Sequence, residues 1–304
     1  MRTLITGANG FVGQHLKREL EANGYTVHTT DISGDVDFIL NLLDGEQVHA
    51  HLKKQRYDSI VHLAGFSSVR LSWENFQKTL ELNVFPTINI LESVSQTHIG
   101  TRVLLIGSSD QYGLAAQAGH PLTEEDPCLP QNPYAISKCT QEQMALVLSV
   151  SKKLDIVLTR SFNHIGPGQR KGFVVSDIAS SIAETENNSA PKLIVGNTQS
   201  HRDFTDVRDV VRAYRLLLEK GRPGEIYNVG SGKVHAIHEV IQMLIKLSGV
   251  SIEVISDAKN FRPSDITKIE CSCEKLRRDT GWLPEIPMHE SLKDTLKWWR
   301  EQQE

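Results

Sequence analysis

The chain has 304 residues, of which 39% are hydrophobic and 23% charged, as in ordinary folded proteins. Lysine and arginine total 33 against 37 aspartate and glutamate, a net charge of −4 without a basic run, which argues against a nucleic-acid surface. No apolar run reaches the roughly 18 residues of a membrane helix, and the N-terminus lacks a secretory signal pattern. We therefore expect a cytoplasmic protein that binds neither nucleic acid nor membranes.

The cysteines predict reduced thiols and no metal site. Cys128, Cys139, Cys271 and Cys273 form no Cys-x-x-Cys pair, and no histidine lies nearby at ligand spacing. A chain of this length buries enough apolar surface to fold without a disulfide or a structural metal.

Short β-rich segments and longer amphipathic segments alternate in the first half of the chain. This alternation is typical of a parallel sheet covered by helices on both faces. We therefore predict an α/β fold with a Rossmann-type, doubly wound parallel sheet. The expected strands are 2–6, 25–30, 59–63, 103–106 and 156–159, and the expected helices are 11–23, 74–95 and 134–153.

The pattern becomes less regular after residue 161, where glycine and proline cluster at 166–168. We predict a Rossmann domain at 1–161 and a smaller C-terminal α/β domain, mainly for substrate, at 162–304. A helical pattern at 206–220 is followed by an apolar run at 225–229. The segment of about 206–230 is therefore expected to return to the first domain.

A glycine-rich turn separates the first predicted strand from the first helix. Gly7, Gly10 and Gly13 lie in TGANGFVG, where backbone N–H groups can approach a pyrophosphate at the positive end of a helix. The spacing GxxGxxG departs from GxGxxG, and tight packing of strand against helix is the alternative explanation. The position after the first strand favours a dinucleotide site.

Asp31 ends the second predicted strand, about 20 residues beyond the glycine turn. An acidic side chain there accepts hydrogen bonds from ribose hydroxyls and repels a 2′-phosphate. No lysine or arginine follows within residues 31–38 to offset the repulsion. NAD(H) is therefore favoured and NADP(H) remains possible, while an aspartate in a solvated loop is the alternative.

Tyr134 and Lys138 form a YxxxK motif on a predicted helix, and the spacing of four places both on one face. We expect the ammonium and the cofactor's positive ring to lower the pKa of the phenol, so that Tyr134 exchanges a proton with a sugar hydroxyl or carbonyl. Ser108 follows the apolar strand at 103–106, at the carboxyl end of the sheet where ligands of such folds bind. These three residues are the candidate catalytic group.

The motifs TGANGFVG, SSDQYG and PYAISK resemble those of the extended short-chain dehydrogenase/reductases that act on nucleotide sugars. RDFTDVRDVV and FRPSD extend the resemblance almost end to end, and FNHIGPGQ is most similar to members that reduce GDP-4-keto-6-deoxy-mannose. The resemblance implies that Ser108 hydrogen-bonds the substrate's C4 oxygen. It also implies that Tyr134 is the general acid/base and that Lys138 binds the nicotinamide ribose.

The resemblance also implies binding residues. For the cofactor they are Phe11, Val12, Ile32, Asn41, Leu42, Leu63, Ala64, Gly65 and Phe162, of which Asn41 departs from the family's usual Asp. For the substrate they are Ser109, Asp110, Asn163, Asn197, Arg202 and Arg262. The two arginines suit the diphosphate, because guanidinium groups bind phosphate oxygens bidentately; a surface ion pair is the alternative for Arg202. His164 is expected to pack or orient, and His28 and His62 to pack in the sheet.

Three functions compete. The first is NAD(P)H-dependent reduction of the C4 ketone of a GDP-4-keto-6-deoxyhexose to a GDP-6-deoxyhexose such as GDP-D-rhamnose. The second is a 4,6-dehydratase or epimerase that recycles its cofactor, and the third is a non-enzymatic dinucleotide sensor. Asp110 favours the first, because dehydratases of the family have Glu there and Asp is shorter by about 1.5 Å. The family also implies a homodimer built through a four-helix bundle.

Overall fold

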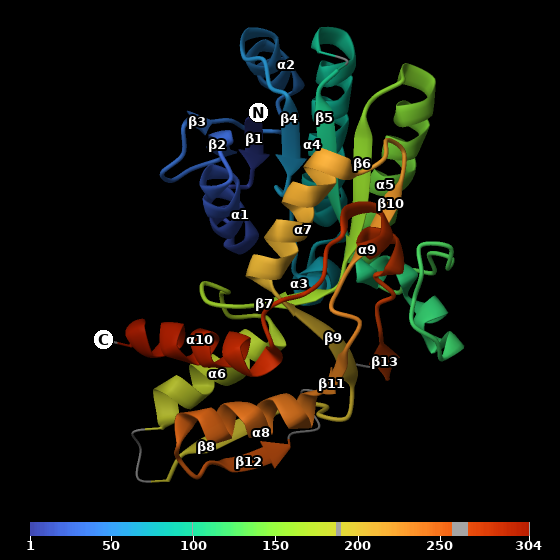
Figure 1. Ribbon diagram of the computed structural model, residues 1–304. Helices are drawn as coiled ribbons and strands as arrows, with labels where there is room; N and C mark the ends of the chain where they lie inside the picture. The colour runs from blue at the N-terminus through green and yellow to red at the C-terminus, as the bar shows by residue number, and fades with distance from the viewer. Residues whose placement is uncertain (99, 187–189, 257–266, 304) are drawn as a thin grey trace.

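The computed structural model describes residues 1–98, 100–186, 190–256 and 267–303. Within them, seven parallel strands form the central sheet in the order β10-β6-β5-β4-β1-β2-β3 (Figure 1). The predicted Rossmann-type α/β class is confirmed. The strands are β1 (Arg2–Thr6), β2 (Thr26–Asp31), β3 (Phe38–Ile39), β4 (Ser59–His62), β5 (Arg102–Ser108), β6 (Ile156–Ser161) and β10 (Ile226–Val229).

Helices cover both faces of this sheet. One face carries α1 (Phe11–Ala22) and α7 (Val207–Lys220), and the other carries α2 (Gly45–Lys54), α4 (Phe76–Thr97) and α5 (Pro133–Lys152). Successive strand residues supply opposite faces: Leu4 belongs to the core under α2, α4 and α5, and Ile5 to the core under α1 and α7. The inner strands β4 and β6 are buried along their whole length, which explains the apolar runs in their sequences.

The helix predicted at 74–95 corresponds to α4, and a short helix that was not predicted precedes it. The structure has α3 (Val69–Glu74) and α4, which meet at Asn75, where the backbone leaves the helical region with φ −139° and ψ 61°. Ser68 starts α3 by accepting a hydrogen bond from the Leu71 N–H at 3.3 Å. None of the described helices is long and apolar enough to cross a membrane.

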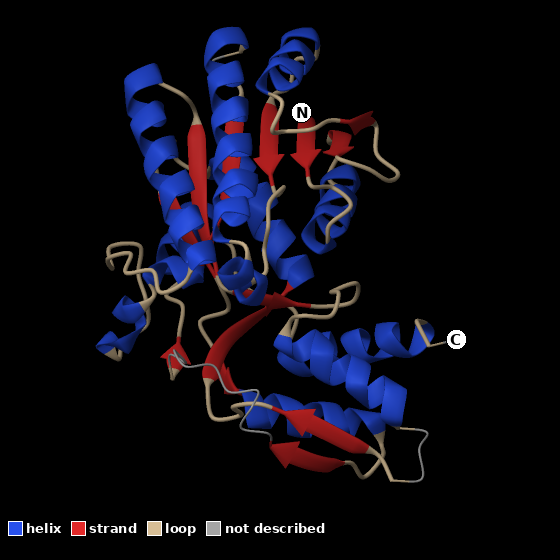
Figure 2. Ribbon diagram, turned by 180° about the vertical axis from the view of Figure 1, so that it is seen from behind, coloured by secondary structure: helices blue, strands red, loops and turns tan. Residues whose placement is uncertain are grey.

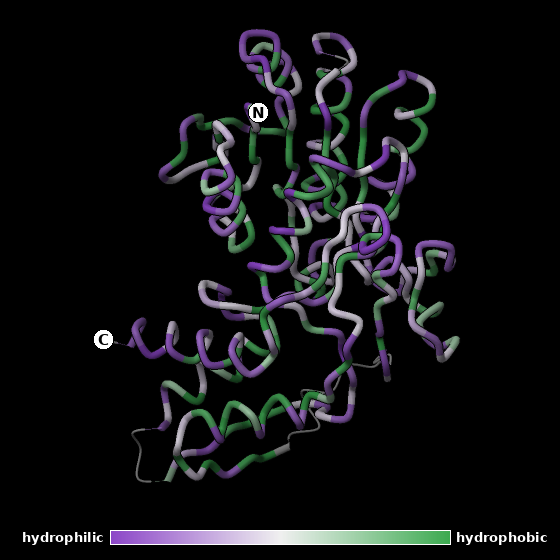
Figure 3. Tube along the Cα trace, viewed as in Figure 1, coloured by the Kyte–Doolittle hydropathy of each residue, from purple (hydrophilic) through white to green (hydrophobic). Residues whose placement is uncertain are grey.

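The remaining elements lie at the carboxyl ends of the central strands, toward which the arrowheads in Figure 2 point. Strands β7 (Asn163–Ile165), β11 (Val234–Ala236) and β13 (Lys268–Ile269) pair with β9 (His201–Asp206), and β8 (Lys192–Val195) pairs with β12 (Glu253–Ser256). Helices α6 (Val174–Thr185), α8 (Ile237–Ser248) and α10 (Met288–Glu301) share an apolar core with β8, and α9 (Glu274–Thr280) packs beside α7. Figure 3 shows apolar residues along the central strands and along α8.

Candidate active site

The glycine-rich turn is pressed between two backbone segments. Gly7 has φ +69°, and a Cβ atom there would lie 2.8 Å from the Ala64 backbone that follows β4. A Cβ on Gly13 would lie 2.6 Å from the Gly7 and Ala8 carbonyl oxygens. Gly10 is the N-cap of α1, and no side chain caps this helix. The turn therefore leaves the positive end of α1 available to a phosphate, as a dinucleotide requires.

Asp31 lies at the end of β2 beside the same turn. One of its oxygens accepts a hydrogen bond from the Asn9 N–H at 3.2 Å, and the other accepts one from the Ile32 N–H at 2.8 Å. Asn9 also donates its side-chain amide to the Ser33 carbonyl at 2.6 Å. Asn9 therefore ties the turn to β2, a role that the sequence did not reveal.

Of the remaining predicted cofactor residues, some line this edge and others are in the core. Leu63, Ala64 and Gly65 follow β4, and Phe11 and Val12 open α1. Ile32 is 69% exposed, whereas Leu42 and Phe162 are buried in apolar clusters. Asn41 is exposed and accepts a hydrogen bond from the Leu43 N–H.

Asn83, on α4, joins the loop after β4 to α5. Its Oδ1 accepts a hydrogen bond from the Phe66 N–H at 2.6 Å, and its Nδ2 donates to the Ser137 hydroxyl at 2.8 Å. A Cβ on Gly65 would lie 2.7 Å from the same Oδ1. Asn83 thus fixes the cofactor-side loop against the helix that carries Tyr134 and Lys138. The sequence gave no signal for this role.

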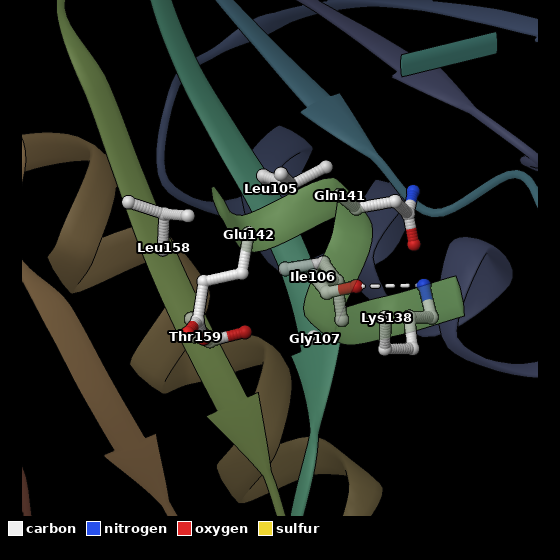
Figure 4. A pocket seen from close by; sticks show the side chains of 8 residues that line it. All are labelled: Leu105, Ile106, Gly107, Lys138, Gln141, Glu142, Leu158 and Thr159. Carbon is white, nitrogen blue, oxygen red and sulfur yellow. Dashed lines mark hydrogen bonds between the residues drawn. The ribbon is translucent and has the colours of Figure 1, made fainter. Parts of the chain in front are cut away.

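The structure brings Ser108, Tyr134 and Lys138 together. Ser108 is the last residue of β5, and the other two lie in α5, each 9% exposed. The Ser108 side chain hydrogen-bonds Tyr134, and it accepts the Asp110 N–H at 3.2 Å. Lys138 donates its Nζ to the Ile106 carbonyl oxygen at 2.8 Å, the dashed line in Figure 4. Residues one turn apart on α5 therefore present a phenol and an ammonium to the end of β5.

The electrostatics of Tyr134 in the protein alone oppose ionisation of the phenol. Burial raises the pKa of the Tyr134 phenol, the negative charge of Asp110 adds to this effect, and the hydrogen bond with Ser108 opposes it. The causes that dominate here are therefore burial and Asp110, and burial also lowers the pKa of Lys138 to about 8. The lowering of the phenol pKa by Lys138 together with the cofactor's positive ring stays a prediction for the complex with the cofactor. Tyr134 is therefore a neutral phenol in the protein alone, and it carries the proton that a reduction would need.

The predicted substrate residues are spread over several elements. Ser109 and Asp110 follow β5; Ser109 is buried and Asp110 half-buried. Asn163 is exposed on β7 and pairs with Phe204 of β9, two residues beyond Arg202. Asn197 lies in the loop after β8, where its Oδ1 accepts the Gln199 N–H. Arg262 lies outside the described residues.

Two further polar side chains near the site, His164 and Asp203, have structural partners. His164 is half-buried, stacks on Phe11 at 6.1 Å and hydrogen-bonds the Phe162 carbonyl, so it packs the 162–169 segment against α1. Asp203 is buried, and its carboxylate accepts hydrogen bonds from Ser231 and from the Gly232 N–H. Among the described residues, no group of three or more His, Cys, Asp or Glu side chains is arranged to hold a metal ion.

Comparison with known proteins identifies the family. The family model described as GDP-mannose 4,6 dehydratase matches residues 4–295. The chain belongs to this family. GDP-6-deoxy-D-mannose reductase of Pseudomonas aeruginosa is 35% identical over 98% of this chain and 97% of that protein. The dTDP-D-glucose 4,6-dehydratase of Homo sapiens is 26% identical over 99% of this chain and 90% of that protein.

Solved structures agree with this family. RMD from Pseudomonas aeruginosa, complexed with NADPH, has a TM-score of 0.91 at 34% identity, covering 99% of both chains. The UDP-glucose 4-epimerase of Thermus thermophilus, in complex with NAD, has a TM-score of 0.87 at 28% identity, covering 99% of both chains. The resemblance to extended short-chain dehydrogenase/reductases is confirmed, and the chain is an NAD(P)-dependent enzyme of that type.

Proposed function

We propose that this enzyme uses NADH to reduce the C4 ketone of a GDP-4-keto-6-deoxyhexose to a GDP-6-deoxyhexose such as GDP-D-rhamnose. The observation that carries the proposal is the buried, protonated phenol of Tyr134, hydrogen-bonded to Ser108 at the end of β5. A ketone reduction needs a proton donor beside the C4 oxygen, and this arrangement supplies one. The 35% identity to a GDP-6-deoxy-D-mannose reductase supports the same substrate class.

In this mechanism, the Ser108 hydroxyl hydrogen-bonds the C4 oxygen and stabilises its developing negative charge. Tyr134 donates its phenolic proton to that oxygen. NADH, when bound, supplies the hydride that C4 receives. Lys138 holds its ammonium one helical turn from Tyr134, where it favours the phenolate formed once the proton has left.

The residues at the carboxyl edge of the sheet fit the cofactor. The turn containing Gly7, Gly10 and Gly13 would hold the pyrophosphate, since any Cβ at Gly7 or Gly13 would collide with backbone. Asp31 would accept hydrogen bonds from the adenosine ribose, which is the basis for preferring NADH over NADPH. Arg202, with Asn163 and Asn197, would bind the nucleotide sugar, so that residues 162–304 act mainly as its binding domain and 1–161 as the cofactor domain.

A 4,6-dehydratase is the second candidate, because Asp110 lies close enough for its charge to raise the pKa of Tyr134. Dehydration, however, begins with oxidation at C4, in which the tyrosine must accept a proton. In the protein alone the raised pKa keeps the phenol protonated, and a protonated phenol cannot accept that proton. Asp110 is also shorter than Glu by about 1.5 Å, which weakens it as a base for the C5 proton.

The experiment compares two substrates. Addition of GDP-4-keto-6-deoxy-D-mannose should cause stoichiometric NADH oxidation. Tyr134→Phe should lower kcat by about 10² to 10⁴, whereas Asp110→Asn should have a much milder effect. Conversion of GDP-D-mannose at catalytic NAD without net NADH consumption, together with a severe Asp110→Asn defect, would establish the dehydratase instead.

We also propose a homodimer in which α4 and α5 of two copies form a four-helix bundle. The two helices pack side by side within the chain, joined by the hydrogen bond from Gln141 to Thr87 at 2.5 Å. Their outer surfaces expose large apolar side chains, with Phe85 53%, Val147 65% and Val150 82% exposed. Such residues on adjacent helices are typical of a surface that a partner covers.

A further inference from the structure

A chain of buried polar side chains lies behind the catalytic residues. Gln111 follows β5, Glu142 is on α5 and Arg160 is on β6, and they are 0%, 3% and 5% exposed. Figure 4 shows the carboxylate of Glu142 beside the cavity that Lys138 and Gly107 also line. The proton transfer and hydride transfer described above use none of these three side chains. Burying them nevertheless costs free energy unless each polar atom is paired.

Glu142 is the centre of this chain. Its Oε2 accepts hydrogen bonds from Gln111 Nε2 at 2.8 Å and from Arg160 Nε at 2.9 Å. Its Oε1 accepts one from Arg160 Nη2 at 2.8 Å and a longer one from Cys128 Sγ at 3.9 Å. A carboxylate has about four acceptor positions. All of them face donors, so the orientation of this group is fixed.

The fixed carboxylate determines how the Gln111 amide is turned. Because the –NH₂ group donates to Glu142, the amide oxygen must point the other way, where it accepts the Ser108 N–H at 2.9 Å. Gly107 permits this approach, since a Cβ there would lie 2.5 Å from Gln111 Oε1. The Ser108 side chain accepts the Asp110 N–H in return, which closes a capping box over the 3₁₀ turn 109–112.

We infer that Gln111 is a positioning residue for Ser108, and that the Glu142–Arg160 ion pair acts through Gln111 to hold the Ser108 hydroxyl beside Tyr134 and the C4 oxygen. This inference rests on the proposed function, in which Ser108 contacts the reacting oxygen. Displacing a contact group by about 1 Å can lower a rate by about 10²-fold. Positioning of Ser108 would explain why an ion pair is kept in the core, where such a pair adds little net stability.

The competing explanation is that the chain only links α5 to β6. A purely structural link would affect stability and leave the rate of folded enzyme unchanged. The test therefore measures kcat and KM well below the melting temperature of each variant. Gln111→Leu removes both hydrogen bonds of the amide. Glu142→Gln keeps the shape but places an –NH₂ group against donors, so that Gln111 loses its fixed orientation.

The matched control is Asp155→Asn. Asp155 pairs with Arg102 at 3.0 Å at the opposite end of β5, so this variant also breaks a partly buried ion pair on the same strand. It should lower the melting temperature and leave kcat unchanged. Gln111→Leu should lower kcat by about 10²-fold, with the KM for the nucleotide sugar and the dissociation constant for NADH changed by less than threefold. Glu142→Gln should lower kcat in the same direction.

A Gln111→Leu enzyme that keeps kcat within threefold of wild type, with stability reduced as in the control, would overturn the inference. If Gln111→Leu does not fold, Glu142→Gln decides by the same criteria. The proposed function fails separately, when the wild-type enzyme does not oxidise NADH with the keto sugar. In that case the crystal structure of Gln111→Leu decides: Ser108 Oγ should be displaced from Tyr134 by about 1 Å or more, and an unmoved hydroxyl would refute its positioning.

Discussion

The buried ammonium of Lys138 should destabilise the folded protein at neutral pH, and this destabilisation should disappear at alkaline pH, where Lys138 loses its proton. Its side chain is 9% exposed, and Nζ donates a hydrogen bond to the Ile106 carbonyl oxygen. Burial lowers the pKa of Lys138 to about 8, from 10.5 for an exposed lysine. At about 1.4 kcal/mol per pH unit, this difference corresponds to about 3 kcal/mol. A buried ammonium that is retained despite such a cost serves the reaction rather than stability.

The direction in which stability changes with pH depends on which state, folded or unfolded, binds more protons. Between pH 8 and 10.5 the unfolded chain keeps the Lys138 proton and the folded protein has lost it. The unfolded state thus binds more protons, and the free energy of unfolding rises with pH across this window. Below pH 8 both states are protonated, so the full penalty of about 3 kcal/mol acts on the folded protein.

Lys138→Met tests this reasoning by urea unfolding at pH 7 and pH 10.5. At pH 7 the variant should be more stable than wild type by about 1 to 2 kcal/mol, because relief of the penalty exceeds the loss of the hydrogen bond to Ile106. At pH 10.5 wild type should have gained about 3 kcal/mol relative to the variant. Lys78→Met, at an exposed lysine of α4, controls for the lost charge. Parallel pH curves for wild type and Lys138→Met would refute the argument.

Three further predictions concern cofactor, substrate and assembly. Asp31→Ser should increase kcat/KM for NADPH relative to NADH, because it removes the charge that repels a 2′-phosphate; a wild-type enzyme that already prefers NADPH would contradict this. Arg202→Ala should mainly raise the KM for the nucleotide sugar through loss of a charge-assisted hydrogen bond of about 1.5 to 3 kcal/mol. An unchanged KM in folded protein would show that Arg202 does not bind the diphosphate. Phe85→Glu with Val147→Glu should give monomers in sedimentation velocity, against dimers for wild type.

The sequence predicts most of the central sheet because strands such as β4, β5 and β6 contain apolar runs between helical patterns, whereas the two-residue β3 gave no such signal. It underestimates where strands end. β5 continues through Ser108 and β6 through Ser161, beyond the apolar residues at 103–106 and 156–159. Backbone pairing maintains the strand there, with Ser108 opposite Ser161, while the side chains change from core to site. Hydropathy alone marks the end of the core and misses the end of the strand.

The catalytic candidates could be predicted because each follows a strand or carries the YxxxK spacing. Their supporting residues could not. Asn83, Gln111 and Glu142 are polar residues on helical segments, where a sequence pattern predicts solvent exposure, yet each is buried. Their burial depends on α4, α5 and β6 meeting at one edge, which only the tertiary fold determines. Asn9 was missed for the same reason, since its partner Asp31 is 22 residues away.

The carboxyl edge of the sheet contains several buried polar side chains, and some of their atoms have no hydrogen-bond partner in the described part of the chain. Burial and the nearby charge of Lys138 lower the pKa of His62 to about 3, so this imidazole is neutral at any working pH. Its Nε2 and the Oε1 of Gln141 are buried atoms for which the described part of the chain supplies no hydrogen bond. Apolar clusters under α1, α7 and α2 offset these costs from outside the site. Substitutions that make this edge apolar should therefore stabilise the fold while lowering kcat, because the groups they remove hold the proton donor and its ammonium neighbour in place.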